Sequence, residues 1–224
     1  MPDTKQDVPA AGARKRKTRI QQMNAERILG AALDVFSQQG FRGATLDEIA
    51  QAAGLSKPNL LYYFDSKEAI YEELLAGLLD TWLDPLRALT ATGDPKEQLL
   101  GYMRRKLEMS RTLPRESRLF ANEVLQGAPR VGEGLSGDLK TLVDEKVALI
   151  RRWADKGRIA RVDPYHLIFS IWALTQHYAD FDVQVRAVLG GDDPYPGAEA
   201  FLETLYVRLL SVEPQTPAAS ASST

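Results

Sequence analysis

The chain has 224 residues, of which 44% are hydrophobic and 26% charged, with a formal net charge of −2 and no cysteine. This length can bury one sizeable core, or a small head and a larger body. The missing cysteines exclude disulfides, thiolate metal sites and a cysteine nucleophile. No apolar run is long enough to span a membrane, and the polar N-terminus lacks the apolar segment of a signal peptide, so we expect a cytoplasmic protein.

The first segment, residues 1–21, is polar and rich in Pro, Ala and Gly, which predicts a disordered arm. Five positive charges fall within six residues of it: Arg14, Lys15, Arg16, Lys17 and Arg19. Such a run is either a solvated tail or an arm that contacts DNA phosphates or the minor groove. Residues 1–67 carry 10 Lys and Arg against 7 Asp and Glu, whereas the remainder is acidic, as in a DNA-binding protein with a separate regulatory domain.

Three helices are predicted next. The first spans residues 22–39 and ends at Gly40. Thr45 then begins a second helix, since Glu48 three residues later completes a capping box. A third helix follows from Ser56 after a link of three residues, which is too short for an antiparallel pair. A helix-turn-helix is therefore predicted within residues 22–67.

The third helix carries side chains that can contact DNA. Asn can pair with an adenine edge and Lys with guanine acceptors, while Tyr and Lys can hold phosphates. The candidate DNA-binding residues are Thr45, Ser56, Lys57, Asn59, Tyr62, Tyr63 and Lys67. The alternative is a polar surface helix in an all-helical domain.

Residues 26–70 resemble the DNA-binding module of TetR-type bacterial transcription repressors, through the run ILGAALDVFSQQGFRGATLDEIAQAAGLSKPNLLYYFDSKEAIY. The resemblance implies a sequence-specific regulator with a helix-turn-helix head and a helical body. Leu61 stands where the family often has Tyr, and Asn59 where a small residue or Thr is common. A different base preference is therefore expected.

The remaining chain predicts further helices and no strands. One helix runs from residue 67 to Pro85, others start near Pro95, Pro114 and Gly137, and the last two span 163–189 and 197–211. The fold class is thus all-α with about nine helices. Residues 68–212 form the expected effector-binding and dimerisation domain, and residues 213–224 a disordered tail.

The segment LIFSIWALTQHYADF, residues 167–181, places an aromatic plane beside an amide on one helical face. That pairing suits a flat ligand with its own amide edge, and a tryptophan on the helix after the head can supply another wall. The candidate effector-binding residues are Trp82, Phe169, Trp172 and Gln176. The alternative is that the Trp side chains are core packing and the Gln is bonded to a neighbouring helix.

A helix-turn-helix head reads one half-site weakly, so we expect a homodimer on a palindromic operator. The helices 163–189 and 197–211 are the candidate dimer surface. Their apolar residues are Ile168, Ile171, Val188, Leu202, Leu205 and Leu209. The alternative is that these residues are intramolecular core.

The sequence has only two His, which makes a metal site unexpected. It has neither a phosphate-binding Gly-rich loop nor a nucleophile elbow, so no cofactor and no enzyme activity are expected. Within the TetR family, residues 27–185 resemble the pyrimidine-utilisation regulators. The motifs are SKPNLLYYFDSKEAIY, LDTWLDPL, SRLF, GDLKTLVDEK and LIFSIWALTQHYADF.

This resemblance implies a repressor of pyrimidine catabolism genes whose effector is uracil, with thymine as a second candidate, bound at Trp82, Trp172 and Gln176. Three alternatives stay open. A repressor of the same family can sense a fatty-acyl or toxic compound, which an apolar tunnel would favour. An enzyme and an architectural DNA protein are the other two.

Overall fold

The computed structural model describes residues 19–212, and every regular element in that range is helical. The predicted all-α fold is confirmed. The basic run at residues 14–17 and the tail from residue 213 lie outside the described residues. No helix within 19–212 is long and apolar enough to cross a membrane.

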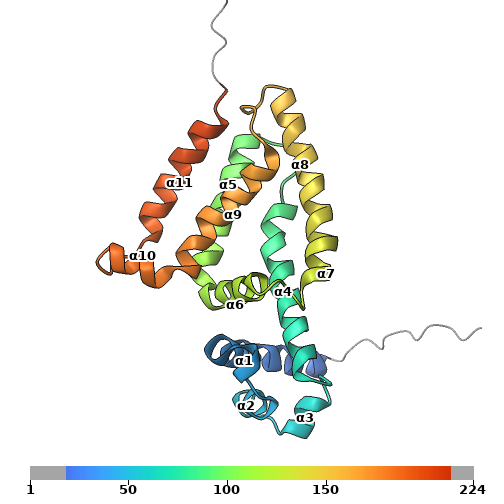
Figure 1. The fold of residues 1–224 in the computed structure, drawn as a ribbon. Coiled ribbons are helices and arrows are strands. Elements are labelled where there is room, and N and C mark those ends of the chain that lie inside the picture. Colours follow the sequence, from blue (N-terminus) through green and yellow to red (C-terminus); the bar gives the residue numbers. More distant parts are fainter. Residues whose placement is uncertain (1–18, 213–224) are drawn as a thin grey trace, which may run out of the picture.

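The head consists of α1 (Arg19–Gly43), α2 (Leu46–Ala52) and α3 (Lys57–Leu61), at one end of the molecule (Figure 1). Helix α1 begins three residues before the predicted start at 22, and Gly40 with φ 69° interrupts it. The predicted capping box is confirmed: Thr45 Oγ1 accepts from the Glu48 backbone, and the Glu48 carboxylate accepts from the Thr45 N–H at 2.9 Å. These caps fix where α2 begins.

Helix α4 (Lys67–Arg87) joins the head to the body (Figure 1). The body contains α5 (Pro95–Thr112), α6 (Pro114–Leu125), α8 (Lys140–Asp155), α9 (Pro164–Asp180) and α11 (Tyr195–Leu210). The prolines begin α5, α6 and α9, where a missing N–H costs no hydrogen bond. Asp94 and Asp163 cap α5 and α9 through their side chains.

Two predicted helices have different bounds. The helix expected over 163–189 is divided, since Phe181 leaves helical geometry at φ −115° and ψ 28° and a separate α10 (Asp182–Val188) follows. The helix expected near Gly137 is preceded by a short α7 (Gly132–Gly134) and a π-helical segment (Leu135–Leu139) before α8. Neither change alters the fold class.

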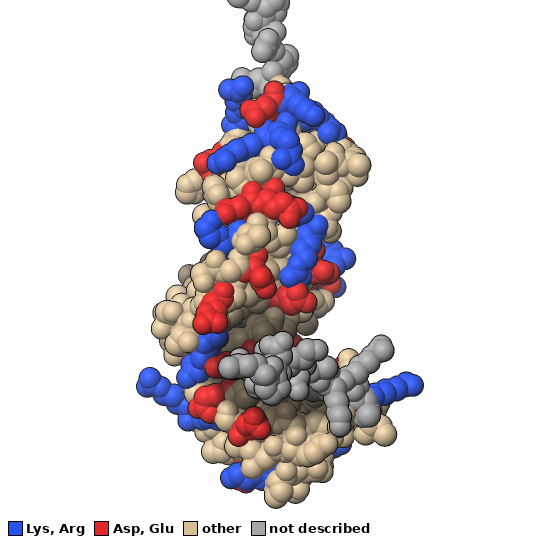
Figure 2. Space-filling view, turned by 90° about the vertical axis from the view of Figure 1, so that its right-hand side faces the viewer, with Lys and Arg blue, Asp and Glu red and all other residues tan. Residues whose placement is uncertain are grey.

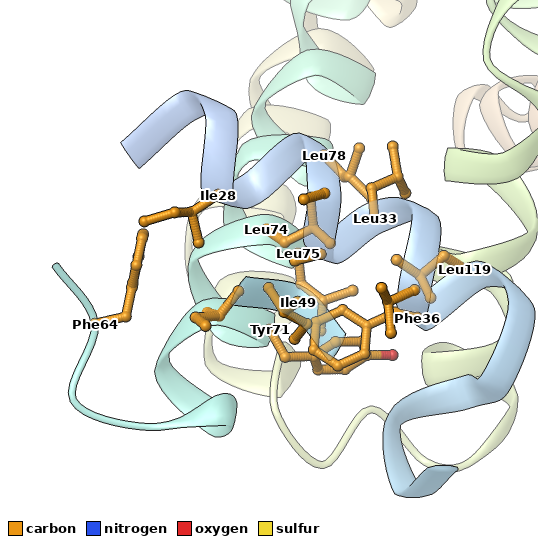
Figure 3. Packing of buried hydrophobic residues seen from close by; sticks show 14 of the residues in the cluster. Ile28, Leu33, Phe36, Ile49, Phe64, Tyr71, Leu74, Leu75, Leu78 and Leu119 are labelled. Atoms are coloured by element: carbon orange, nitrogen blue, oxygen red, sulfur yellow. The ribbon is translucent and has the colours of Figure 1, made fainter. Parts of the chain in front are cut away.

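The hydrophobic core has two clusters. The first joins the head to α4 and α6; in Figure 3, Leu33 and Phe36 of α1 lie against Leu78 of α4 and Leu119 of α6. The second fills the body between α5, α8, α9 and α11. The predicted domain boundary at residue 67 coincides with the first residue of α4, and the first cluster continues across it. The head is therefore anchored to the body by shared apolar packing.

The body surface carries charges of both signs. Figure 2 shows acidic and basic side chains interleaved along the face that it draws. Mixed charge of this kind favours solubility rather than attraction to a polyanion.

Candidate DNA-reading surface and effector site

The third helix presents its polar residues to solvent. Leu60 is fully buried against the head core, whereas Ser56, Lys57 and Asn59 are exposed. Ser56 caps the helix by accepting from the Asn59 N–H at 3.4 Å. The Lys57 ammonium group lies 2.9 Å from the Asp47 carboxylate, an exposed ion pair that costs little to break. The side chains of Lys57 and Asn59 are therefore accessible to the groove of a DNA duplex.

Tyr62 and Tyr63 link the third helix to α1. Their rings meet edge to face at 5.1 Å. The Gln21 amide donates to the Tyr62 hydroxyl at 3.2 Å, and the Asn24 amide donates to the Tyr63 hydroxyl at 2.8 Å. Tyr62 is 69% exposed and Tyr63 is half-buried, so Tyr62 is the better placed of the two for a phosphate contact.

Lys67, another candidate DNA-binding residue, is half-buried at the start of α4. Its ammonium group donates to the backbone carbonyls of Phe41 and Ala44, both at 2.8 Å, and lies 4.6 Å from the centre of the Phe41 ring. The side chain thereby closes the turn between α1 and α2 from the start of α4. Lys67 therefore ties the start of α4 to that turn.

The predicted effector residues of α9 are arranged along α5. The indole N–H of Trp172 donates to the Tyr102 hydroxyl at 2.5 Å. Gln176 lies one turn beyond Trp172, and Asp180 one turn beyond that. Phe169 contacts the Trp172 ring at 5.6 Å between centroids but is 45% exposed, so the structure leaves it at the edge of this group.

Trp82 reaches the same region from α4. Its ring lies 5.4 Å from the Lys106 ammonium group of α5, one turn beyond Tyr102. Within residues 19–212, the buried Trp82 indole N–H has no hydrogen-bond partner. Trp82 and Trp172 therefore both meet the Tyr102–Lys106 turn of α5, and Gln176 follows Trp172 by one turn of α9; we call these five residues the body site.

Charges at the body site are perturbed by burial. Burial lowers the pKa of Lys106 to about 8, and the Asp180 carboxylate partly opposes this shift. Burial likewise raises the pKa of Asp180, against the hydrogen bond that its carboxylate accepts from the Ser117 hydroxyl at 2.6 Å. A buried ammonium group with a shifted pKa beside the Trp82 ring marks a candidate functional site.

Sequence reasoning missed Tyr102 and Lys106. A signal for Lys106 exists, because it shares the inward stripe of α5 with apolar Leu99 and Met103. A lysine in such a stripe must pair its buried charge, because an unpaired buried charge destabilises the folded state. Within the described residues, no group of three or more metal-ligating side chains is found.

The predicted dimer surface is partly corrected. Ile168, Ile171 and Leu202 are fully buried within the chain, because they face the body core. Leu209 and Val188 are exposed, Leu205 is half-buried, and Phe201 of α11 adds a large exposed ring. The exposed apolar side chains therefore lie on the outer faces of α10 and α11.

Two family models together match almost all of the described chain. The model described as "Bacterial regulatory proteins, tetR family" matches residues 28–74, and the model described as "YcdC-like protein, C-terminal region" matches residues 75–213. The HTH-type transcriptional regulator RutR of Escherichia coli strain K12 is 53% identical over 175 residues, which is 78% of this chain and 82% of RutR.

Solved structures agree with the fold. The putative transcriptional regulator SCO4942 from Streptomyces coelicolor has a TM-score of 0.68 at 24% identity, covering 85% of this chain and 99% of that one. AibR, solved in complex with isovaleryl coenzyme A and operator DNA, has a TM-score of 0.61 at 17% identity, covering 81% and 97%. At these identities the likeness shows a common fold.

Proposed function

This chain belongs to the tetR family of bacterial regulatory proteins, and from that premise we propose that it represses pyrimidine catabolism genes and leaves its operator when it binds uracil. Membership of this family makes the protein a DNA-binding transcriptional regulator. The effector assignment is carried by one observation: the rings of Trp82 and Trp172 meet one turn of α5, where the buried Trp82 indole N–H has no acceptor among the described residues. The similarity to RutR directs that observation to a pyrimidine.

The proposed DNA surface comprises α2 and α3. Asn59 is the proposed base reader, since its amide can pair with an adenine edge. Thr45, Ser56, Lys57, Tyr62 and Tyr63 are the proposed positioning contacts to phosphates, which fix register without reading sequence. Lys67 is proposed to act through the turn that it closes. Two such heads in a homodimer would need a separation of about 34–36 Å on a palindromic operator.

The side chains of the body site match uracil by their polarity. A flat ring can lie against Trp82 or Trp172, and the Gln176 amide can both donate to and accept from an imide edge. No side-chain hydrogen bond involves Gln176 within the described residues, so its amide is available. A fatty-acyl chain would leave these polar groups buried without partners, which is costly.

Operator release tests the proposal directly. The purified protein selects its DNA from a random pool, and the selected duplex is labelled for fluorescence anisotropy. Uracil, thymine, cytosine and a medium-chain fatty acid are then titrated into the complex. We expect uracil to release the DNA, and to quench tryptophan fluorescence excited on the red edge.

Other results separate the alternatives. Release by the fatty acid and not by uracil would replace the effector while leaving the regulator in place. Binding to every duplex with equal affinity would favour an architectural protein and overturn the proposed base reading.

A further inference from the structure

A cleft of about 1040 Å³ lies between the head and the body, and we call it the junction cleft. Its walls come from the second half of α1, from α6, which lies alongside α1 (Figure 1), and from the loop after α6. Phe36 and Leu119, labelled in Figure 3, form its buried inner wall. None of the five residues of the body site lines the junction cleft, so it is a separate cavity.

The junction cleft carries an excess of positive charge. Four arginines and two acidic residues line it, and both acidic residues are already paired. The carboxylate of Asp34 in α1 pairs with the guanidinium group of Arg115 in α6. The carboxylate of Glu123 lies 3.4 Å from the guanidinium group of Arg130. Two arginines therefore remain without an acidic partner in the cleft.

These two arginines, Arg42 and Arg118, keep most of their hydrogen-bond donors free. Arg118 of α6 donates to the Ala179 carbonyl at 3.2 Å, which uses one of the five donors of its guanidinium group. The guanidinium group of Arg42, at the end of α1, has no acceptor and no ion pair among residues 19–212. One free guanidinium group thus comes from the head and the other from the body.

The charge and the size of the junction cleft together favour a phosphate monoester as its ligand. Guanidinium groups bind phosphate and carboxylate oxygens through paired, charge-assisted hydrogen bonds. A phosphate monoester brings three acceptor oxygens and a charge near −2, which balances two unpaired arginines, whereas a single carboxylate brings less charge. Ligand pockets usually span about 300–1,000 Å³, so the cleft also has room for the ester group.

We propose that the junction cleft is a second ligand site, which binds a phosphate monoester of sugar or nucleoside size through Arg42 and Arg118. Because α1 belongs to the head and α6 to the body, a molecule bound there bridges the two. The regulator would thereby have a second small-molecule input besides the effector of the body site. This inference does not depend on the identity of that effector.

Titration calorimetry on the full chain tests the proposal with two probes, ribose 5-phosphate and adenosine 5′-monophosphate, at constant ionic strength. Ribose and adenosine are the matched ligands without the phosphate. We expect both phosphorylated probes to bind and neither matched ligand to do so. The titrations are repeated with an excess of uracil, which occupies the body site and should leave the affinity for the probes unchanged.

Variants of the junction cleft identify the groups that bind. Arg42→Met and Arg118→Met should each weaken probe binding by about fivefold or more, because a charge-assisted hydrogen bond is lost. Arg42→Lys keeps the charge without the planar fork and should recover part of the affinity. Asp34→Asn removes the carboxylate that competes for Arg115 and should tighten binding by about twofold. Arg152→Met, at an exposed arginine of α8, is the matched control and should leave the affinity unchanged.

Three results would overturn the inference. The first is that neither phosphorylated probe binds, and the second is that Arg42→Met and Arg118→Met bind the probes as tightly as the wild type, or no more weakly than Arg152→Met does. The third is that uracil displaces the probes, since they would then occupy the body site. In each case the regulator and its proposed response to uracil stand, because operator release tests them separately.

Discussion

At the residue scale, Asn59 tests the proposed base reading. It is exposed on α3 and its side chain makes no contact that the head needs, since only its backbone N–H is used, by Ser56. Asn59→Ala should weaken operator binding by about 1–3 kcal/mol and relax specificity at one base pair. Anisotropy with single-base operator variants measures both effects. Glu97→Ala, exposed in the body, is the control, and equal losses on all operators would contradict base reading by Asn59.

The lowered pKa of buried Lys106 predicts the sign of a pH dependence in the free energy of unfolding. Its pKa is lowered to about 8 from an ordinary value of 10.5, chiefly by burial, so between these values the unfolded chain holds the proton more tightly. The cost to the folded state is present below pH 8 and is relieved as pH rises toward 10.5. The shift corresponds to at most about 3 kcal/mol.

Lys106→Met removes this cost. Without effector, we expect the variant to exceed the wild type in free energy of unfolding by urea at pH 7, and the difference to shrink between pH 8 and 10.5. Tyrosine titrations are common to both chains and cancel. A difference that is constant with pH would show that Lys106 keeps an ordinary pKa.

The role of a residue could be predicted from the sequence when its partners lie close to it along the chain, and not when they lie far away. Thr45, Glu48 and Ser56 were predictable as caps because their partners lie three residues away. Lys67 was not, because its acceptors are the carbonyls of Phe41 and Ala44, whose positions depend on the turn at Gly40. Trp172 and Gln176 follow from one helical face, whereas Tyr102 joins them only through the packing of α5 on α9.

At the element scale, both ends of α6 form side-chain hydrogen bonds to other parts of the chain. Near its start, the Ser117 hydroxyl donates to Asp180, whose carboxylate acts on the charge of Lys106 in the body site. Near its end, buried Glu123 accepts from the backbone N–H of Arg130 at 2.8 Å and from its guanidinium group at 3.4 Å. That guanidinium group lies 3.7 Å from the Phe41 ring centre in the head. Helix α6 thus connects the body site to the head.

Arg130→Ala should therefore weaken communication between effector and operator. The cation–π contact is worth about 0.5–2 kcal/mol, and coupling losses of similar size are expected. We expect uracil to bind with unchanged affinity by calorimetry but to lower operator affinity less than in the wild type. Arg111→Ala, exposed on α5, is the control. Unchanged coupling in Arg130→Ala would exclude this route.

Element starts were more predictable than element ends. Asp94 and Asp163 stand directly before a proline, so their helices were placed correctly from the sequence. The break at Phe181 has no Gly or Pro beside it, and it arises where the apolar face of α9 ends and exposed α10 begins. The π-helical segment at 135–139 likewise has no local signature that periodicity detects.

At the scale of the whole molecule, the exposed apolar side chains of α11 bear on assembly. Phe201 is 59% exposed, and exposed Leu209 and half-buried Leu205 lie further along the same helix. Clustered apolar surface of this kind marks protein interfaces. A two-fold interface places each copy of Phe201 against the same surface of its partner, so one substitution acts twice.

Phe201→Glu should therefore separate the dimer, because two carboxylates would be buried in one interface. We expect sedimentation analysis to show half the wild-type mass, and operator affinity to fall steeply, since each free head reads only one half-site. Leu125→Glu, an equally drastic change at an exposed apolar residue of α6, is the control. A dimer that survives Phe201→Glu with operator binding intact would move the interface away from α11 and require the heads to be spaced by other contacts.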